Sequence, residues 1–422
     1  MWKNKSSDAV CFINFVPYLA DVTTLSLTTM KEVQNSTSTS PQHPVDFLPW
    51  SDPRNIVSYQ AYLDTLFYYN NIFKPLVVTA GIATNIVNCL VFRRQGLKDR
   101  MNLCLFVHAL VDMTYLVSSL AFNVTYWIKL LQPVPGEELY RKTHCYAMGV
   151  CAGFREASAC INAVIAVERC VCVVFPLMAN SLMSTKAMGI MLVAIVIGMQ
   201  LAFATNPIKR YVYPVYDNTT GMTMWQMARS AAWQDNEALL LYDTVDDTIM
   251  MIIFPFVIFA LVSGVTTITV VKLRAAMSWR RKASSRGNHA QPQQVALTKM
   301  LVLASCIFVA CKVPVIAFTM GRVVYPEFSP FGSQHNAFRI ADLIAPYFPY
   351  AHCAVSFFVY YSLSSRFRSE LQGLCGCSRA TTVPERSPET PGAWKIPTEN
   401  VNQSLKILPS EFFTKTITFL WK

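Results

Sequence analysis

Seven long apolar stretches, separated by shorter polar segments, dominate the pattern of hydrophobic and polar positions along the chain. A helix needs about 20 consecutive, mostly apolar residues to cross a lipid bilayer, and each stretch meets that length within a few residues. The pattern therefore predicts an all-α membrane protein, a seven-transmembrane helix bundle. We expect its spans near Ile72–Phe92, Leu103–Asn123, Ala147–Val173, Ala187–Ala204, Thr248–Val271, Met300–Phe318 and Ala341–Leu363.

The segments on either side of the spans have a different composition. Residues 1–66 are rich in Ser, Thr and Asn, which predicts a mostly disordered extracellular tail before a bundle domain at 67–374. Residues 365–371, Ser-Arg-Phe-Arg-Ser-Glu-Leu, combine charged and apolar side chains, which predicts a short amphipathic helix on the membrane surface. Residues 375–422 are expected to form a cytoplasmic tail. It opens with Cys375 and Cys377, which are palmitoylation candidates; two unmodified surface thiols are the alternative.

The charge pattern supports a membrane protein and sets its expected orientation. Only 14% of the 422 residues are charged, against about 25% in soluble domains. The net charge of +11 comes from residues beside apolar runs. This placement favours a membrane protein that follows the positive-inside rule over a nucleic-acid-binding protein. With the N-terminus outside, the inner segments hold twelve Lys and Arg and the outer ones eight. We therefore expect a multi-pass protein of the plasma membrane.

Possible glycosylation sites agree with this orientation. Four Asn-x-Ser/Thr sequences fall on the expected outer side, and a fifth at Asn402 falls on the inner side. The four glycosylation candidates are Asn4, Asn35, Asn123 and Asn218.

Several classes of protein are disfavoured by what the chain lacks. It has no Cys-x-x-Cys pair or Cys/His ligand cluster of a zinc site, and no nucleophile–base constellation of an enzyme. It has no inverted repeat and no pair of Gly/Pro-broken spans, which argues against a transporter or channel.

Short motifs occur in order along the spans. They are Gly81 and Asn85, Asp112, Glu168-Arg169-Cys170, Pro176-Leu177, Pro255, Phe308 with Cys311–Pro314, and Ser356–Tyr360. In order and spacing these motifs resemble those of rhodopsin-like (class A) G-protein-coupled receptors. The region around the third and seventh spans also resembles invertebrate neuropeptide and putative chemosensory receptors.

The resemblance implies a G-protein switch at the inner end of the bundle. Arg169 is expected to be held by Glu168 at rest and released toward a heterotrimeric G protein on activation, with Pro176 and Tyr360 nearby. Receptors of this kind often add an acidic residue on the sixth span as a second latch, but the corresponding position here is Gln294. We therefore expect a weaker latch and measurable basal signalling.

The resemblance also implies a polar network in mid-bundle and three helix hinges. In the family the position of Asp112 binds a sodium ion together with a third-span Ser, here Ser158. On the seventh span His352 and Ser356 stand where Asn is usual, and Asn85 completes the network. A hydrogen-bonded acid without sodium is the alternative. The hinges are expected at Pro255, Phe308 and Pro314.

Cys151 and three charged residues inside the spans are candidates for the ligand cavity. Glu156 lies thirteen residues from Arg169, and Lys312 thirteen from Lys299, so both lie about 20 Å from the inner end. We predict a Glu156–Lys312 ion pair with Arg155 beside it. A purely structural pair and direct ligand contact both remain open.

One departure from the family concerns the outer side. Cys145 stands near the family's third-span Cys, but its usual partner is absent because no Cys occurs between Cys172 and Cys306. A Cys11–Cys145 bridge and an unpaired thiol are the alternatives.

Residues in the spans and in the outer segments limit the classes of ligand that we expect. The seventh span has no Lys for a retinal Schiff base, and Cys151 replaces the Asp typical of amine receptors, so neither an opsin nor an amine receptor is expected. Six acidic residues precede the fifth span, which favours a basic peptide by electrostatic steering. The alternative is a chemosensory receptor for small waterborne odorants.

Overall fold

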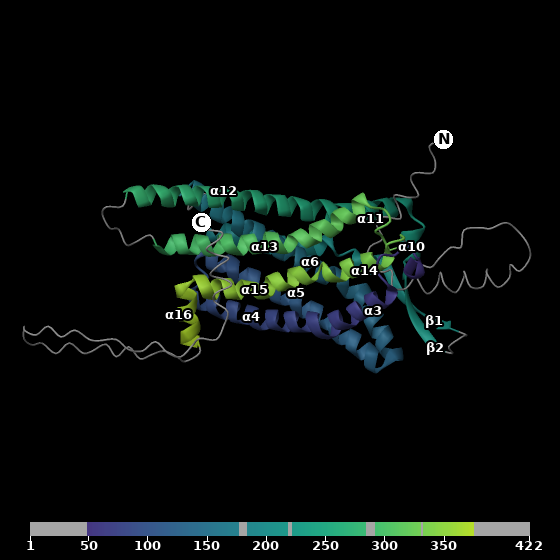
Figure 1. The fold of residues 1–422 in the computed structure, drawn as a ribbon. Helices are drawn as coiled ribbons and strands as arrows, with labels where there is room; N and C mark the ends of the chain where they lie inside the picture. Colours follow the sequence, from purple (N-terminus) through teal and green to yellow (C-terminus); the bar gives the residue numbers. More distant parts are fainter. Residues whose placement is uncertain (1–48, 177–183, 218–221, 284–291, 331, 375–422) are drawn as a thin grey trace, which may run out of the picture. The chain divides into compact units, whose positions relative to one another are not determined.

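The computed structural model describes residues 49–176, 184–217, 222–283, 292–330 and 332–374. Seven helical segments in these ranges are long and apolar enough to cross a membrane, which confirms the predicted seven-helix bundle (Figure 1). Every predicted span lies within one of them or overlaps it closely. The segments are Tyr59–Gln95, Arg100–Leu131, Pro133–Val174, Thr185–Lys209, Glu237–Ser278, Ala296–Val324 and His335–Leu363.

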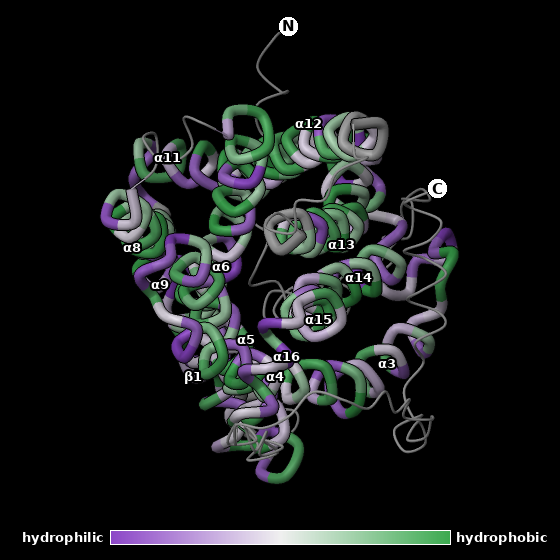
Figure 2. The backbone as a smooth tube through the Cα atoms, turned by 90° about the vertical axis from the view of Figure 1, so that its left-hand side faces the viewer, coloured by the Kyte–Doolittle hydropathy of each residue, from purple (hydrophilic) through white to green (hydrophobic). Residues whose placement is uncertain are grey.

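The bundle closes on itself through helix-to-helix packing. Helix α4 (Lys74–Gln95) packs against α5 (Arg100–Leu131) and α15 (Tyr347–Leu363), and α15 packs against α13 (Pro292–Val324). Helix α12 (Phe254–Ala283) joins α13 to α6 (Pro133–Val174), which also contacts α5 and α8 (Thr185–Ala202). In the end-on view of Figure 2, α13 and α15 lie side by side within this ring.

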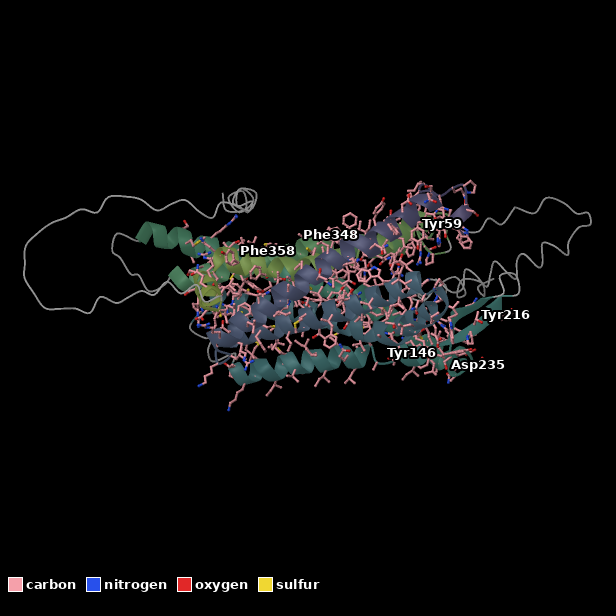
Figure 3. All side chains as sticks on the ribbon, turned by 90° about the horizontal axis from the view of Figure 1, so that it is seen from below. Tyr59, Tyr146, Tyr216, Asp235, Phe348 and Phe358 are labelled. Carbon is pink, nitrogen blue, oxygen red and sulfur yellow. The ribbon has the colours of Figure 1, made fainter. Side chains whose placement is uncertain are left out.

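Small side chains on α6 let neighbouring helices approach closely. Ala159, Ala163 and Ala166 are buried against Ile258 and Val262 of α12. Small residues are favoured at such membrane interfaces because they bring backbones together. Apolar side chains such as Phe348 and Phe358 on α15 are seen on the outer faces of the bundle (Figure 3), where lipid is expected.

A π turn interrupts both the first and the fifth span, directly before a proline. The first span consists of α3 (Tyr59–Tyr68), η2 (Tyr69–Phe73) and α4; the fifth consists of α11 (Glu237–Thr248), η3 (Ile249–Ile253) and α12. Pro75 and Pro255 follow the turns by two residues, and a proline cannot donate to the carbonyl one turn earlier. The π turn relieves that conflict, as is common for such bulges.

The bundle domain begins earlier than the expected boundary at residue 66. Ser58 caps α3 by accepting a hydrogen bond from the Ala61 amide. The preceding turn η1 (Pro49–Ser51) packs on α14 (His335–Ile344), where the Asn336 side chain donates to the carbonyls of Trp50 and Val57. Residues 49–66 therefore lie with the helices and not in a separate tail.

The connection between the second and third spans is helical, where a loop was expected. Only Gln132 separates α5 from α6, and α6 with its 42 residues is about 63 Å long. Glu137 bridges the hairpin by pairing with Lys129 of α5 and with Arg141, each at 2.6 Å. A Cβ atom added to Gly136 would lie 2.5 Å from the Lys129 Cα atom, so only glycine allows this close approach.

A β-hairpin covers the same end of the bundle. Strands β1 (Arg210–Asp217) and β2 (Met222–Arg229) pair antiparallel, with Arg210 opposite Arg229. Short helices α9 (Asn206–Lys209) and α10 (Ala231–Gln234) flank it. Cys145 is buried against Met227 of β2 and is a free thiol in the described structure; Cys11 lies outside the described residues. We call this end of the bundle the hairpin end.

The predicted surface helix is present at the opposite end, which we call the α16 end. Helix α16 (Ser365–Leu374) buries Phe367 against Phe92 and Tyr360, with ring centroids 5.6 and 6.0 Å apart. Glu370 pairs with Arg94 at 2.9 Å, which ties the surface helix to the end of α4.

Candidate functional site

Glu168 and Arg169 form an ion pair near the end of α6, at the α16 end of the bundle. Arg169 Nε lies 2.5 Å from Glu168 Oε2, and the Glu168 side chain is fully buried. The angles do not make this contact a hydrogen bond, so the attraction is mainly electrostatic. The predicted partners are thus brought together.

Arg100 is a second partner of the same carboxylate, and sequence reasoning missed this role. Its Nε donates to Glu168 Oε1 at 2.8 Å, and its Nη2 lies 3.3 Å from the sulfur of Cys172. The Asp99 side chain caps α5 and so places Arg100 at the start of that helix. In the sequence, Arg100 was counted only as one of the positive charges on the inner side. The signal that could have drawn attention to it was Asp99, a typical capping residue, which places Arg100 at the start of a helix.

The remaining predicted switch residues lie nearby but play different parts. Tyr360 is buried between Phe92 and Phe367, with its ring 5.3 Å from that of Phe92. Pro176 is exposed two residues after the end of α6. The side chain of Gln294 lies outside the described part of the chain.

Asp112 lies at the centre of a buried polar network between α5, α6 and α15. Ser158 Oγ donates to its Oδ1 atom at 2.5 Å, as the sequence predicted. His108 Nδ1 lies 3.5 Å from Asp112 Oδ2, and Asn162 Nδ2 lies 2.6 Å from His108 Nε2. His108 and Asn162 therefore extend the network to residues that the sequence did not single out for it.

Two further members of the predicted network, Asn85 on the first span and Ser356 on the seventh, bond to the backbone. The Asn85 amide donates to the carbonyls of Gly81 and Cys353 at 2.9 and 3.0 Å, linking α4 to α15. Ser356 Oγ donates to the carbonyl of His352, one turn earlier on its own helix. Asn85 and Ser356 thus bond to the backbone and do not reach the carboxylate by any hydrogen bond described here.

The donor atoms around Asp112 do not fit a sodium ion. Sodium is a hard cation that prefers oxygen ligands, whereas α15 presents a ring nitrogen of His352 and the sulfur of Cys353. These two atoms and an Asp112 oxygen lie within 4.8 Å of one another. A mixed oxygen, nitrogen and sulfur set suits softer metals better. Lys312 lines the small cavity beside His352 and Cys353, and its charge opposes a monovalent cation there.

A cavity of about 380 Å³ occupies the hairpin end of the bundle. Ligand sites for small molecules usually have volumes of about 300–1,000 Å³. The candidate Cys151 lies on its wall, and Pro255 and Lys312 line it as well. Aromatic side chains form much of the remaining wall, among them Tyr69, Tyr115, Phe122, Tyr126, Tyr140 and Tyr350.

Three charged residues lie close together at the deepest point that the cavity reaches along α6 and α13. Arg155 Nε donates to Glu156 Oε1 at 2.6 Å, and Lys312 Nζ lies 3.9 Å from Glu156 Oε2. The structure therefore brings Glu156 and Lys312 together as predicted, although at a distance too long for a hydrogen bond. Lys312 also lies 5.6 Å from the ring centre of Phe308, the predicted hinge residue one turn away, while α13 continues through Pro314.

Two of the six acidic residues before the fifth span form ion pairs within the described structure. Asp243 is buried and contacts Lys209 Nζ at 2.5 Å and Arg229 Nη2 at 3.1 Å. Asp246 also lies 3.2 Å from Lys209. These pairs hold the β-hairpin on α11, and they reduce the negative charge that was expected to attract a basic peptide.

The candidate modification sites divide into two groups. Asn123 is buried in α5 and its amide donates to the Asn70 carbonyl at 2.7 Å, which leaves no space for a glycan; this glycosylation candidate is wrong. The others lie outside the described residues: Asn4, Asn35, Asn218, Cys375 and Cys377.

A seven-helix membrane bundle with an aromatic cavity at one end and a buried Glu–Arg pair at the other is the arrangement expected of a G-protein-coupled receptor. Residues 72–378 match the family described as serpentine type 7TM GPCR chemoreceptor Srw. The chain belongs to this family of chemoreceptors. A comparison with curated proteins found no match. The family match supports the chemosensory alternative better than the peptide receptor that the sequence favoured.

Proposed function

We propose that this protein is a chemosensory receptor of the plasma membrane. It binds a small waterborne ligand in the cavity at the hairpin end and activates a heterotrimeric G protein at the α16 end. The volume of about 380 Å³ carries this proposal, because it suits a small molecule better than an extended peptide. The hairpin end then faces outward, as the excess of basic residues on the other side favours.

The path from ligand to G protein runs along α6 and α13. Glu156 and Arg169 lie on the same helix, about 20 Å apart, so the cavity and the ion pair share one rigid element. Lys312, the partner of Glu156, lies two residues before Pro314 in α13. A ligand that shifts this pair favours an outward tilt of α13 and the release of Arg169 from Glu168.

A cell-based screen tests the proposal. The receptor is expressed with a promiscuous G protein and exposed to small waterborne odorants and to basic amidated peptides. We expect responses to odorants that disappear in Arg169→Ala, with surface expression of the variant measured by an N-terminal epitope tag in unpermeabilised cells. A response to peptides alone contradicts the chemosensory assignment, and a tag accessible only after permeabilisation contradicts the orientation.

A further inference from the structure

We propose that the cavity binds an anion: a small molecule with a carboxylate on an aromatic or apolar body, held by Arg155. This inference rests on the proposed function and adds the chemical class of the ligand. The proposed ligand is negatively charged, whereas the acidic segment before the fifth span had favoured a positively charged one.

Arg155 presents an incompletely used guanidinium group to the cavity. Its Nε donates to Glu156, whereas its two terminal nitrogens make no bond with any other described residue. The side chain is 30% exposed and lines both the large cavity and a smaller one of about 20 Å³ beside it. A guanidinium group binds a carboxylate through two parallel hydrogen bonds, so the two terminal nitrogens of Arg155 are suited to bind an anion.

Two other cations on the cavity wall, Lys74 and Arg210, also have no carboxylate within ion-pair distance in the described structure. Lys74 on α4 lies 5.9 Å from the ring centre of Tyr350 and forms no ion pair there. Arg210, at the start of β1, lines the cavity without an acidic partner within 4 Å. Burial lowers the pKa of Arg210, which is the effect of a positive charge held away from water with too little negative charge around it.

The balance of charges on the whole wall points the same way. Six cations line the cavity and only two carboxylates, Glu156 and Asp342, do so. Glu156 is shared by Arg155 and Lys312, and its Oε2 atom accepts no hydrogen bond. Asp342 lies 3.9 Å from Arg339, another cation of the wall. A ligand anion would lower the repulsion that this excess of positive charge creates.

The aromatic walls determine the rest of the ligand. Tyr115 and Tyr350 stack with their ring centroids 5.1 Å apart, and the Tyr350 hydroxyl accepts a hydrogen bond from Ser119 at 2.8 Å. Phe122 packs against His144 at 4.9 Å on the same wall. Such flat, fixed rings favour an aromatic body of matching size beside the anionic group.

An anion on Arg155 would also act on the Glu156–Lys312 pair. A ligand carboxylate bound to the two terminal nitrogens of Arg155 neutralises part of its charge and so weakens its attraction for Glu156, which is bound to Nε. Glu156 is then free to approach Lys312, from which its Oε2 atom now lies 3.9 Å away. The resulting stronger pair would draw on α13 next to Pro314, which connects anion binding to the helix that is expected to tilt.

Matched probes of opposite charge test the inference. Cells expressing the receptor with a promiscuous G protein are exposed to phenylacetate and indole-3-acetate, to phenethylamine and tryptamine, and to neutral 2-phenylethanol. We expect the two carboxylates to activate the receptor and to raise the thermal midpoint of the purified protein, and the amines to do neither. Arg155→Gln should raise the half-maximal carboxylate concentration at least about 10-fold, the value of one charge-assisted hydrogen bond.

Two further variants keep the test decisive. Lys142→Gln removes a cation from the exposed face of the same helix and should leave the carboxylate response unchanged. Arg155→Lys keeps the charge but not the two-pronged geometry, so its response should lie between those of the wild type and Arg155→Gln.

The inference is overturned if amines or the neutral alcohol act as well as the carboxylates, or if no carboxylate shifts either readout. It is also overturned if Arg155→Gln responds like the wild type. Basal signalling that depends on Arg169 is measured in the same cells. If that signalling persists while the carboxylates fail, the receptor function stands and only the ligand class is wrong; if both fail, the proposed function fails too.

Discussion

Asp243 is expected to anchor the β-hairpin on the bundle through its ion pairs. The substitution Asp243→Asn preserves shape but removes the charge between Lys209 and Arg229. Lys209 is only 2% exposed, and breaking a buried pair from one side costs about 3–5 kcal/mol. Because Asp246 still lies 3.2 Å from Lys209, we expect the lower end, about 3 kcal/mol.

The assay is a thermal-shift measurement on the purified receptor. With an unfolding entropy of about 2.1 cal/mol/K per residue, a loss of about 3 kcal/mol corresponds to roughly 5 °C for a bundle of about 300 residues. Asp235→Asn is the matched control, since Asp235 is exposed and has no ion pair in the described structure; it should change the midpoint by less than about 2 °C. Reducing agent should have no effect on the midpoint, because Cys145 is a free thiol. Equal shifts for the two variants, or a larger shift with reductant than with Asp243→Asn, would refute the reasoning.

Three further outcomes are expected. Arg100→Gln leaves the Glu168 carboxylate to Arg169 alone, so basal nucleotide exchange on the G protein should fall, and a rise would contradict the shared pair. Replacing sodium by choline at constant ionic strength should leave basal signalling within about 2-fold, because the donors around Asp112 do not suit sodium; a larger change would restore the sodium site. Gly136→Ala should lower stability by about 1–3 kcal/mol in thermal unfolding, although alanine is the better helix former, and a gain would disprove the tight hairpin.

The spans could be predicted because the thickness of the bilayer sets the length of each apolar run, and that length can be read directly from the sequence. The helical extension at the start of α6 could not, since Glu137 and Glu138 interrupt its hydrophobicity and its stability comes from pairing with α5. The β-hairpin was missed for a similar reason. Its contacts with α6 and α11 join residues distant in sequence, such as Cys145 with Met227.

The candidate site divides in the same way. The proximity of Glu156 and Lys312 followed from counting residues along two helices, because rise per residue converts sequence offset into depth. Arg100 escaped notice because it reaches Glu168 from a different helix, 68 residues away in the chain. A basic peptide was expected because the sequence shows acidic residues such as Asp243 but not the cations, Lys209 and Arg229, that lie against them in the fold.

The π turns before Pro75 and Pro255 affect how this cavity can be compared with that of any relative. Each turn holds one residue more than an α-helical turn, and one residue corresponds to about 100° of rotation around the helix axis. Side chains between each π turn and the hairpin end therefore point in directions about 100° away from those expected by counting back from the proline along a regular α-helix. An alignment of the first and fifth helices needs a one-residue gap wherever a relative lacks the turn, whereas α6 and α13 need none.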